Sequence, residues 1–319
     1  MVAGNRLWVP VSGAGCSLMP LDITTGALAG PSVQFGGPPL DGVIGFSFCY
    51  SGDAVTTGPH VVTTWSYFGV TLAPHSGCPN FQVFARGKGL AAVNTDAPAT
   101  TEWTTGGLAT GCPSVQPDPP PPYAQSSSDD TRVFSPGTNG FSRCLLAGCA
   151  SPGSVDAGTP VVPVPTVLST GDLAVAATDG RVLVLDPLTS AVRWTGTVGA
   201  PLSVPLAVTP TTIYAAAGDG RVAALPAAGC GAATCDPTWT ATLPAPAADR
   251  PTVGADVLYV GGSDGTVTAL PAAGCGAALC TALWTAAMDA PVAAPPVIAS
   301  GTLYVATTGG MTAFRLPAE

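Results

Sequence analysis

The stretch LYVGGSDGTVTAL, residues 258–270, decides the fold. Two short runs of alternating aliphatic residues flank Asp264-Gly265, a dipeptide that favours a tight hairpin because its turn needs positive φ. The pattern recurs as IYAAAGDGRVAAL (213–225), LAVAATDGRVLVL (173–185) and LYVATTGGMTAF (303–314). The copies start 40, 45 and 45 residues apart, the period of four-stranded propeller blades. The repeats therefore predict a β-propeller.

Strand pairs of this type number seven along the chain. They lie near Trp8, Val83, Phe134, Ala174, Tyr214, Tyr259 and Tyr304. We expect an all-β chain forming a single β-propeller domain over residues 1–319, with seven four-stranded blades; six or eight blades are the alternatives. The last copy lacks its outermost strand and the first has hardly any innermost strand. The N- and C-terminal strands are therefore expected to close one shared blade and so remove exposed edges.

The repeat is regular only over residues 166–319. Residues 31–80 lose the period and are predicted to form an irregular blade or insert, after which FQVFARGKGLAAVNT (81–95) resumes as a strand pair. Residues 111–130 include four consecutive prolines from Pro119 to Pro122. Such a segment is stiff and cannot join a strand ladder, so it predicts a surface excursion between blades.

Composition excludes several classes of protein. Charged residues are 9 % and hydrophobic residues 46 %, with 40 Gly and 34 Pro, so the chain can bury a core despite its many turn residues. The net charge is −9 and Lys88 is the single lysine, which argues against nucleic-acid binding. The chain has no run of 18 apolar residues without Gly, Pro or polar interruptions, so the sequence predicts no transmembrane segment. MVAGNRLWVP does not resemble an export signal, so we expect any signal or anchor to lie outside this sequence.

The ten cysteines point to an oxidising compartment. AAGCGAATC and AAGCGAALC place Cys230/Cys235 and Cys275/Cys280 at the same position of adjacent repeats, each pair closing a hairpin rather than forming a zinc site. These local disulfides predict an extracellular or cell-surface location. The other six cysteines allow fifteen pairings, with the partners of Cys16, Cys112, Cys144 and Cys149 left open. Cys49 with Cys78 is preferred because it would tether the irregular blade.

Cys144 and Cys149 bracket what looks like one continuous strand. At about 3.3 Å per residue they would lie too far apart to bridge each other. We therefore expect each of them to pair elsewhere.

The units following the hairpins resemble a known repeat. LVLDPLTSAVRW (183–194) is similar to the pyrroloquinoline-quinone-type propeller repeat, roughly A-x-D-x-x-T-G-x-x-x-W, through Asp186, Thr189 and Trp194. Asp22, Thr25 and Gly26 match the same pattern without the tryptophan. The resemblance covers residues 166–314 and implies the propeller fold, with no particular activity.

The resemblance does not extend to the quinone site. Quinone-binding members of this superfamily have a longer eight-bladed domain, a vicinal disulfide and a calcium ion held by Glu, Asn and Asp. This chain has no Cys-Cys dipeptide, and its glutamates are Glu102 and Glu319. We expect neither a cofactor nor a metal site.

Four tryptophans occupy equivalent places on the predicted outer strands: Trp103, Trp194, Trp239 and Trp284. Stacking platforms for sugars would use such residues. Recurrence once per blade instead favours docking of each blade on its neighbour. We interpret these tryptophans as blade-docking residues.

Residues 31–80, where the repeat is lost, are the predicted place of any recognition surface. Aromatic and titratable side chains concentrate there in a chain poor in both, namely His60, Trp65, Tyr67, Phe68 and His75. Loops on a rigid scaffold commonly carry binding residues. The alternative is that the three aromatics fill the core of an atypical blade. Neither a G-x-S-x-G nor an H-E-x-x-H motif accompanies the histidines, so no catalytic residue is assigned.

The sequence thus predicts a non-enzymatic propeller outside the cell. It would serve as a protein-interaction or structural module of an extracellular assembly, with a protein partner or self-assembly. A carbohydrate-binding propeller is one alternative. A secreted hydrolase or lyase is another, and it would need acids converging on His60 or His75.

Overall fold

A computed structural model describes most of the chain. The described residues are 2–3, 5–12, 16–35, 45–57, 59–71, 83–96, 99–104, 108–111, 127–129, 131–137, 140–299 and 301–315. Within these ranges every regular element is a strand, and no helix could cross a membrane. Two compact units are separable, one of residues 1–137 and 141–154, the other of residues 138–140 and 155–319.

The first unit holds three sheets. Their strand orders are β1-β2-β3-β4, β5-β6-β7-β8 with β9 also on β7, and β10-β11-β12-β13. The first sheet is β1 (Val2–Ala3), β2 (Arg6–Val11), β3 (Cys16–Asp22) and β4 (Val33–Phe35). The second is β5 (Gly45–Thr57), β6 (His60–Thr71), β7 (Val83–Asn94), β8 (Thr100–Thr104) and β9 (Leu108–Gly111). The third is β10 (Ser127–Ser128), β11 (Arg132–Gly137), β12 (Gly140–Leu145) and β13 (Gly148–Asp156).

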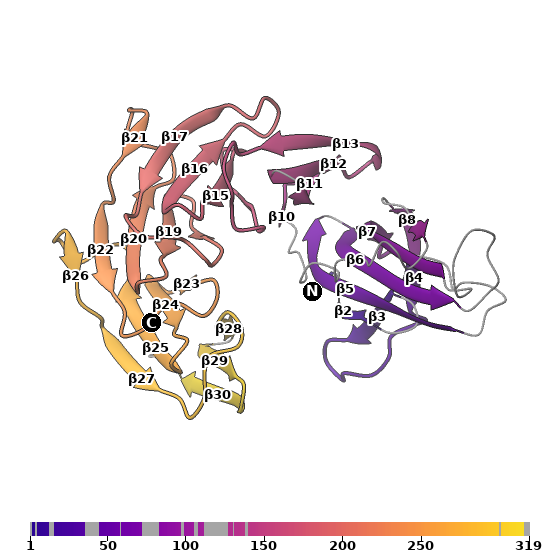
Figure 1. The fold of residues 1–319 in the computed structure, drawn as a ribbon. Coiled ribbons are helices and arrows are strands. Elements are labelled where there is room, and N and C mark those ends of the chain that lie inside the picture. The colour runs from indigo at the N-terminus through magenta and orange to yellow at the C-terminus, as the bar shows by residue number, and fades with distance from the viewer. Residues whose placement is uncertain are drawn as a thin grey trace. The chain divides into compact units, whose positions relative to one another are not determined.

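The second unit holds four further sheets (Figure 1). The fourth contains β14 (Thr166–Val167), β15 (Leu173–Ala176), β16 (Arg181–Leu185) and β17 (Val192–Thr197). The fifth contains β18 (Ala207–Val208), β19 (Thr212–Ala216), β20 (Arg221–Pro226) and β22 (Trp239–Thr242). The sixth contains β23 (Thr252–Gly254), β24 (Val257–Gly261), β25 (Thr266–Pro271) and β27 (Trp284–Ala287). The seventh contains β28 (Val297–Ala299), β29 (Thr302–Thr307) and β30 (Gly310–Arg315). These seven sheets correspond to the seven predicted blades.

Each regular blade is built around the predicted hairpin. In the sixth sheet Leu258 faces Leu270 and Gly261 faces Val267, so the aliphatic runs pair across the turn. The turn differs from the predicted one, because only Gly265 of the Asp-Gly pair has positive φ, at +85°. The Asp264 carboxylate instead accepts a hydrogen bond from Thr266 N at 2.9 Å. This geometry is that of a three-residue hairpin loop with a glycine bulge.

Two short strands each add a fifth strand to a four-stranded blade, one to the fourth blade and one to the fifth. β21 (Thr234–Cys235) pairs in parallel with β17 of the preceding blade, and β26 (Leu279–Cys280) pairs in parallel with β22. Thr195 N donates to Ala233 O at 2.9 Å, and Thr240 N donates to Ala278 O at 2.8 Å. Both strands belong to the segments that the cysteine pairs close, hereafter the Cys loops (residues 230–235 and 275–280). Each Cys loop therefore adds a fifth strand to the blade before it.

The core lies between successive sheets. One cluster joins Val182 and Trp194 of the fourth blade to Ile213 and Leu225 of the fifth. Another joins Tyr214 and Trp239 of the fifth blade to Leu258, Leu270 and Ala272. Alternating strand residues on each face of a sheet thus pack against the next blade, as stacked repeats require.

The described residues of the predicted irregular segment 31–80 divide between two sheets. β4 is the outer strand of the first sheet, whereas β5 and β6 begin the second. The predicted strand pair in residues 81–95 is wrong, because Val83–Asn94 is one continuous strand that pairs with β6 from Thr71↔Val83 to His60↔Asn94. Residues 112–126 of the predicted proline-rich excursion lie outside the described residues.

The described disulfides confirm two predicted pairs and correct the others. Cys230–Cys235 and Cys275–Cys280 are bonded, with Cα–Cα distances of 5.7 and 5.6 Å. The prediction of Cys49 with Cys78 is wrong, because Cys49 on β5 bonds Cys16 on β3 and so links the first two sheets. Cys78 and Cys112 lie outside the described residues.

Cys144 and Cys149 are also bonded to each other, contrary to the prediction. The physical reason is that β12 ends at Leu145 and β13 begins at Gly148, so the chain reverses between the two cysteines. Gly148 has a φ of +148°, which permits this tight reversal. The Cα atoms are consequently only 5.0 Å apart.

The ends of the chain follow the prediction in part. The seventh sheet has three strands, without a fourth strand beyond β30 among the described residues. The first sheet already contains a short edge strand, β1, paired with β2. Closure of a shared blade by the two termini stays a prediction.

Candidate functional site

The predicted recognition residues lie on or beside β6. His60 begins this strand, and its Nε2 lies 2.8 Å from Glu102 Oε2. Asn94 Nδ2 donates to the other Glu102 oxygen at 3.0 Å. These contacts join β6, β7 and β8, so His60 supports the second sheet. His75 lies outside the described residues.

Trp65 fits the core-packing alternative. Only 5 % of its surface is exposed, in a cluster with Trp8, Cys16 and Val61. Its Nε1 donates to Leu90 O at 3.3 Å, which satisfies the one polar atom of the ring. Tyr67 and Phe68 belong to the same strand, and their side chains are outside the description. Recognition by these residues stays a prediction.

Trp194 and Trp239 lie where one blade meets the next. Both are buried, at 6 % and 3 % exposure, within clusters that include residues of the following blade. Trp239 Nε1 donates to Ala272 O at 3.3 Å, and Tyr214 Oη donates to the same carbonyl at 3.0 Å. Trp284 is half-buried between Tyr259 and Phe314, at centroid distances of 6.0 and 5.9 Å. These contacts support blade docking; the side chain of Trp103 is outside the description.

The Cys loops complete this docking. A Cβ added at Gly229 would lie 2.9 Å from Trp194 Cδ1, and one added at Gly274 would lie 2.6 Å from Trp239 Cδ1. Each glycine directly precedes a Cys loop and lets this part of one blade approach the indole of the blade before it. At 6 % and 3 % exposure, the rings of Trp194 and Trp239 present little surface on which a sugar could stack.

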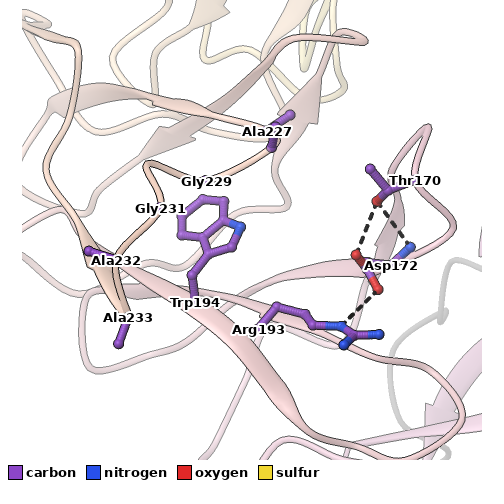
Figure 2. A pocket seen from close by; sticks show the side chains of 10 residues that line it. Thr170, Asp172, Arg193, Trp194, Ala227, Gly229, Gly231, Ala232 and Ala233 are labelled. Carbon is purple, nitrogen blue, oxygen red and sulfur yellow. Dashed lines mark hydrogen bonds and ion pairs between the residues drawn. The ribbon is translucent and has the colours of Figure 1, made fainter.

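A pocket of about 480 Å³ lies beside Trp194 (Figure 2). One wall carries Thr170, Asp172 and Arg193 of the fourth blade. The opposite wall is the first Cys loop and the segment before it, residues 227–233, whose side chains are small. The pocket is thus the seam between an outer strand and the loop that covers it.

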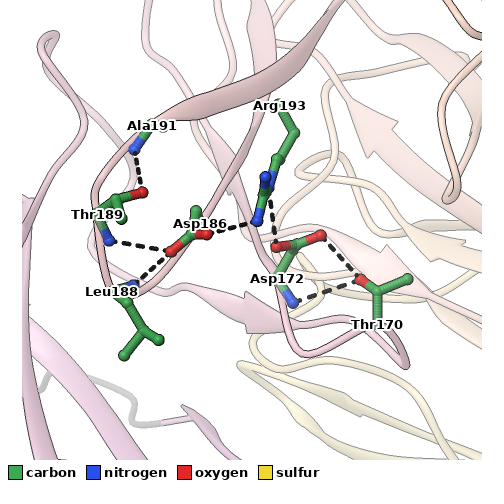
Figure 3. A network of polar contacts seen from close by, with 7 residues as sticks. All are labelled: Thr170, Asp172, Asp186, Leu188, Thr189, Ala191 and Arg193. Atoms are coloured by element: carbon green, nitrogen blue, oxygen red, sulfur yellow. Dashed lines mark hydrogen bonds and ion pairs between the residues drawn. The ribbon is translucent and has the colours of Figure 1, made fainter.

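The polar wall of the pocket is an ion-pair network (Figure 3). Arg193 Nη2 lies 2.5 Å from Asp186 Oδ2, and Arg193 Nε lies 3.6 Å from Asp172 Oδ1. Thr170 Oγ1 donates to Asp172 Oδ2 at 3.2 Å. Two carboxylates thus face one guanidinium, so the network is negative overall and has no uncompensated positive charge to attract an anion.

Asp186 has a structural part in this network. Its Oδ1 accepts hydrogen bonds from Thr189 N at 3.0 Å and Leu188 N at 2.8 Å. These backbone hydrogen bonds, followed by the charge of Arg193, hold the pKa of Asp186 below its usual value. These interactions favour the carboxylate form of Asp186 over the protonated acid. Within the described ranges no three His, Cys, Asp or Glu side chains gather as metal ligands.

Sequence reasoning missed the parallel strands β21 and β26. The available signal was the recurrence of both Cys loops just before a Trp strand of nearly identical sequence, WTAT (239–242) and WTAA (284–287). A two-residue strand is too short to show a period, so the pattern predicted the disulfide but not its partner strand.

Residues 179–275 match the family described as outer membrane protein assembly factor BamB. The resemblance to quinoprotein-type repeats is confirmed. The match covers the fifth blade and parts of the fourth and sixth, including the first Cys loop. No curated protein sequence matches this chain.

Solved structures show the same fold along nearly the whole chain. BamB from Moraxella catarrhalis has a TM-score of 0.57 and 17 % identity, covering 97 % of this chain and 81 % of that one. The computationally designed Ika8 protein has a TM-score of 0.55 and 13 % identity, covering 99 % and 95 %. A chain of the mitotic checkpoint complex has a TM-score of 0.59 and 12 % identity, covering 98 % and 86 %. The predicted seven-bladed β-propeller is confirmed.

Proposed function

We propose that this protein is a non-catalytic β-propeller that acts as a protein-interaction module of an assembly outside the cytoplasm. The observation that carries the proposal is the match of residues 179–275 to a family described as an assembly factor. The site geometry agrees with it. His60 is held by Glu102, Asp186 is held as a carboxylate by backbone donors, and the buried tryptophans dock blades.

The disulfides support an extracellular or cell-surface location. Four cysteine pairs are bonded in the described part of the chain, which is the usage expected in an oxidising compartment. One of them, Cys16–Cys49, links two blades. Reduction inside a cell would release this link as well as the Cys loops.

Native isolation tests the proposal. Extracts of the cell envelope and of the secreted fraction, prepared with thiol blocking, would be separated by native electrophoresis and probed for this chain. We expect a species well above the mass that the same chain shows after denaturation, with a second protein cross-linked to it. Recovery only at the mass of a single chain, or from the reduced cytoplasmic fraction, would contradict the proposal.

A further inference from the structure

The outer strand of the sixth blade is built like that of the fifth. Trp239 faces Ala224 of β20, and Trp284 faces Ala269 of β25 in the equivalent register. β22 is covered on its other side by β26, as β17 is by β21. Across the described ranges, β27 pairs only with β25 (Figure 1). Among the described residues, this type of edge thus occurs twice with a fifth strand and once without one.

The hydrogen-bonding groups on this edge can be assigned by register. Thr240 faces Ala223, and its N–H points away from β20 to donate to Ala278 O. Thr285 faces Thr268 in the same way, so its N–H also points outward. Thr285 is exposed, and Trp284 is half-buried where Trp239 is buried. The edge of β27 therefore presents both a backbone donor and part of an indole.

The two strands that occupy the equivalent edges define the chemistry of an occupant. They are Ala233-Thr234-Cys235 and Ala278-Leu279-Cys280, from loops in which residues 228–235 and 273–280 carry no charge. Each contributes a carbonyl to a threonine N–H and a glycine against the tryptophan. A second copy of this chain is a poor occupant, because its Cys loops already pair with its own β17 and β22.

We propose that the edge of β27 binds an extended, uncharged, small-residue segment of a partner protein, which adds to the sixth blade as a parallel fifth strand. The main chain of the segment accepts from Thr285 N–H, and its small side chains leave room for Trp284. Strand addition of this kind obtains affinity from backbone hydrogen bonds and specificity from side-chain pockets. The inference rests on the proposed function and names the contact surface for it.

The test uses the chain's own loop as the probe. A disulfide-closed peptide of residues 271–282, PAAGCGAALCTA, carries a fluorophore and is titrated with the whole protein, with binding measured by anisotropy. We expect saturable binding. Thr285→Pro should weaken it about tenfold, because proline removes the outward N–H yet is tolerated on an edge strand. Thr285→Ala, which keeps the N–H, should bind within about threefold of the wild type.

Amide hydrogen exchange of the wild-type protein provides a second test, which does not depend on whether Thr285→Pro folds. Excess peptide should slow amide exchange in residues 284–287 and leave residues 239–242 unchanged, because β22 is already covered. Absence of saturable binding up to about 1 mM would overturn the proposal, as would binding that Thr285→Pro leaves intact or protection confined to another blade. If a native partner is found and still binds Thr285→Pro, the interaction module stands and this surface is wrong.

Discussion

At the residue scale, Asp186 and Asp22 show what the Asp of the repeat does. Asp22 Oδ1 accepts from Thr24 N and Thr25 N at 2.9 and 2.8 Å, as Asp186 Oδ1 accepts from Leu188 N and Thr189 N. Gly26 ends the first turn with a φ of +68°, and Ser190 takes its place in the second at +61°. The Ser190 hydroxyl accepts from Asp156 N at 3.1 Å, a bond that glycine could not provide.

We expect these carboxylates to make the stability of the protein sensitive to acid. Backbone hydrogen bonds lower the pKa of Asp22 and Asp186, and a side-chain hydrogen bond from Thr266 lowers that of Asp264. A folded-state pKa below the unfolded value means that the stabilisation is complete above the unfolded pKa and is lost as the pH falls through the folded pKa. We expect urea midpoints to be steady from about pH 7 to 5 and to fall below about pH 4.

The variant Asp186→Asn tests whether Asp186 contributes to the fall of the urea midpoint in acid. The amide oxygen can still accept from Leu188 and Thr189, but the group no longer titrates. The acid fall of the urea midpoint should therefore be shallower in the variant than in the wild type. Equal slopes would show that Asp186 does not contribute to the acid sensitivity.

Gly274 and Gly276 form a matched pair for measuring loop docking. Both lie in or next to the second Cys loop with left-handed backbone, at φ values of +88° and +79°. A Cβ at Gly274 would meet Trp239, whereas one at Gly276 would meet nothing within 4 Å. Alanine at either position adds about 1–2 kcal/mol of backbone strain. We expect Gly274→Ala to lower the unfolding free energy by at least about 1 kcal/mol more than Gly276→Ala, because the indole must move.

Urea unfolding of the two variants and their tryptophan emission would be compared. Only Gly274→Ala should change the emission of the folded protein. Equal losses of stability and identical spectra would mean that the loop does not pack on Trp239.

At the element scale, the Cys loop is both a covalent hairpin and a strand of the neighbouring sheet. Spacing alone predicted the covalent part, because two cysteines five positions apart in adjacent repeats close a hairpin. It could not predict Cys16–Cys49, whose partners come from different sheets and carry no shared pattern. Cys144–Cys149 was missed because the residues between them read as strand, although Leu146-Ala147 form a turn.

Removing the second Cys-loop disulfide should therefore have a local and a neighbouring effect. The double variant Cys275→Ala/Cys280→Ala loses about 2 kcal/mol from the entropy of loop closure. It should also loosen β26 from β22 and expose Trp239, giving a red shift in emission. Faster hydrogen exchange over residues 239–242 would show the loss of the fifth strand.

Cys144→Ala/Cys149→Ala is the control for this variant. It opens a loop with the same sequence separation of 5, between β12 and β13 of one sheet. Its stability loss should be similar, with exchange in residues 239–242 unchanged. Protection of β22 that survives in Cys275→Ala/Cys280→Ala would show that the disulfide is not needed to hold β26.

At the scale of the whole molecule, the seven blades were predictable where the period is 40–45 residues and less so where strands lengthen. The second sheet contains strands of 13, 12 and 12 residues, against four to six in the two hairpin strands of each regular blade. Long strands displace the turns and remove the period that reveals a repeat. The sequence therefore predicted that the second sheet forms one blade, but it did not predict which residues form each strand of that sheet.

Calorimetry can decide whether this fold unfolds as the single domain that the repeats predict. In a repeat array each blade is stabilised chiefly by its neighbours, so seven blades of one propeller should unfold together, with equal calorimetric and van't Hoff enthalpies. Trp8→Phe alters a fully buried residue of the first unit, and Trp239→Phe alters one of the second. Both should lower the midpoint of one common transition, whereas Leu188→Ala, at a site 64 % exposed, should leave it unchanged. Two transitions, each shifted by only one of the tryptophan variants, would instead make residues 1–137 and 155–319 separately folding domains.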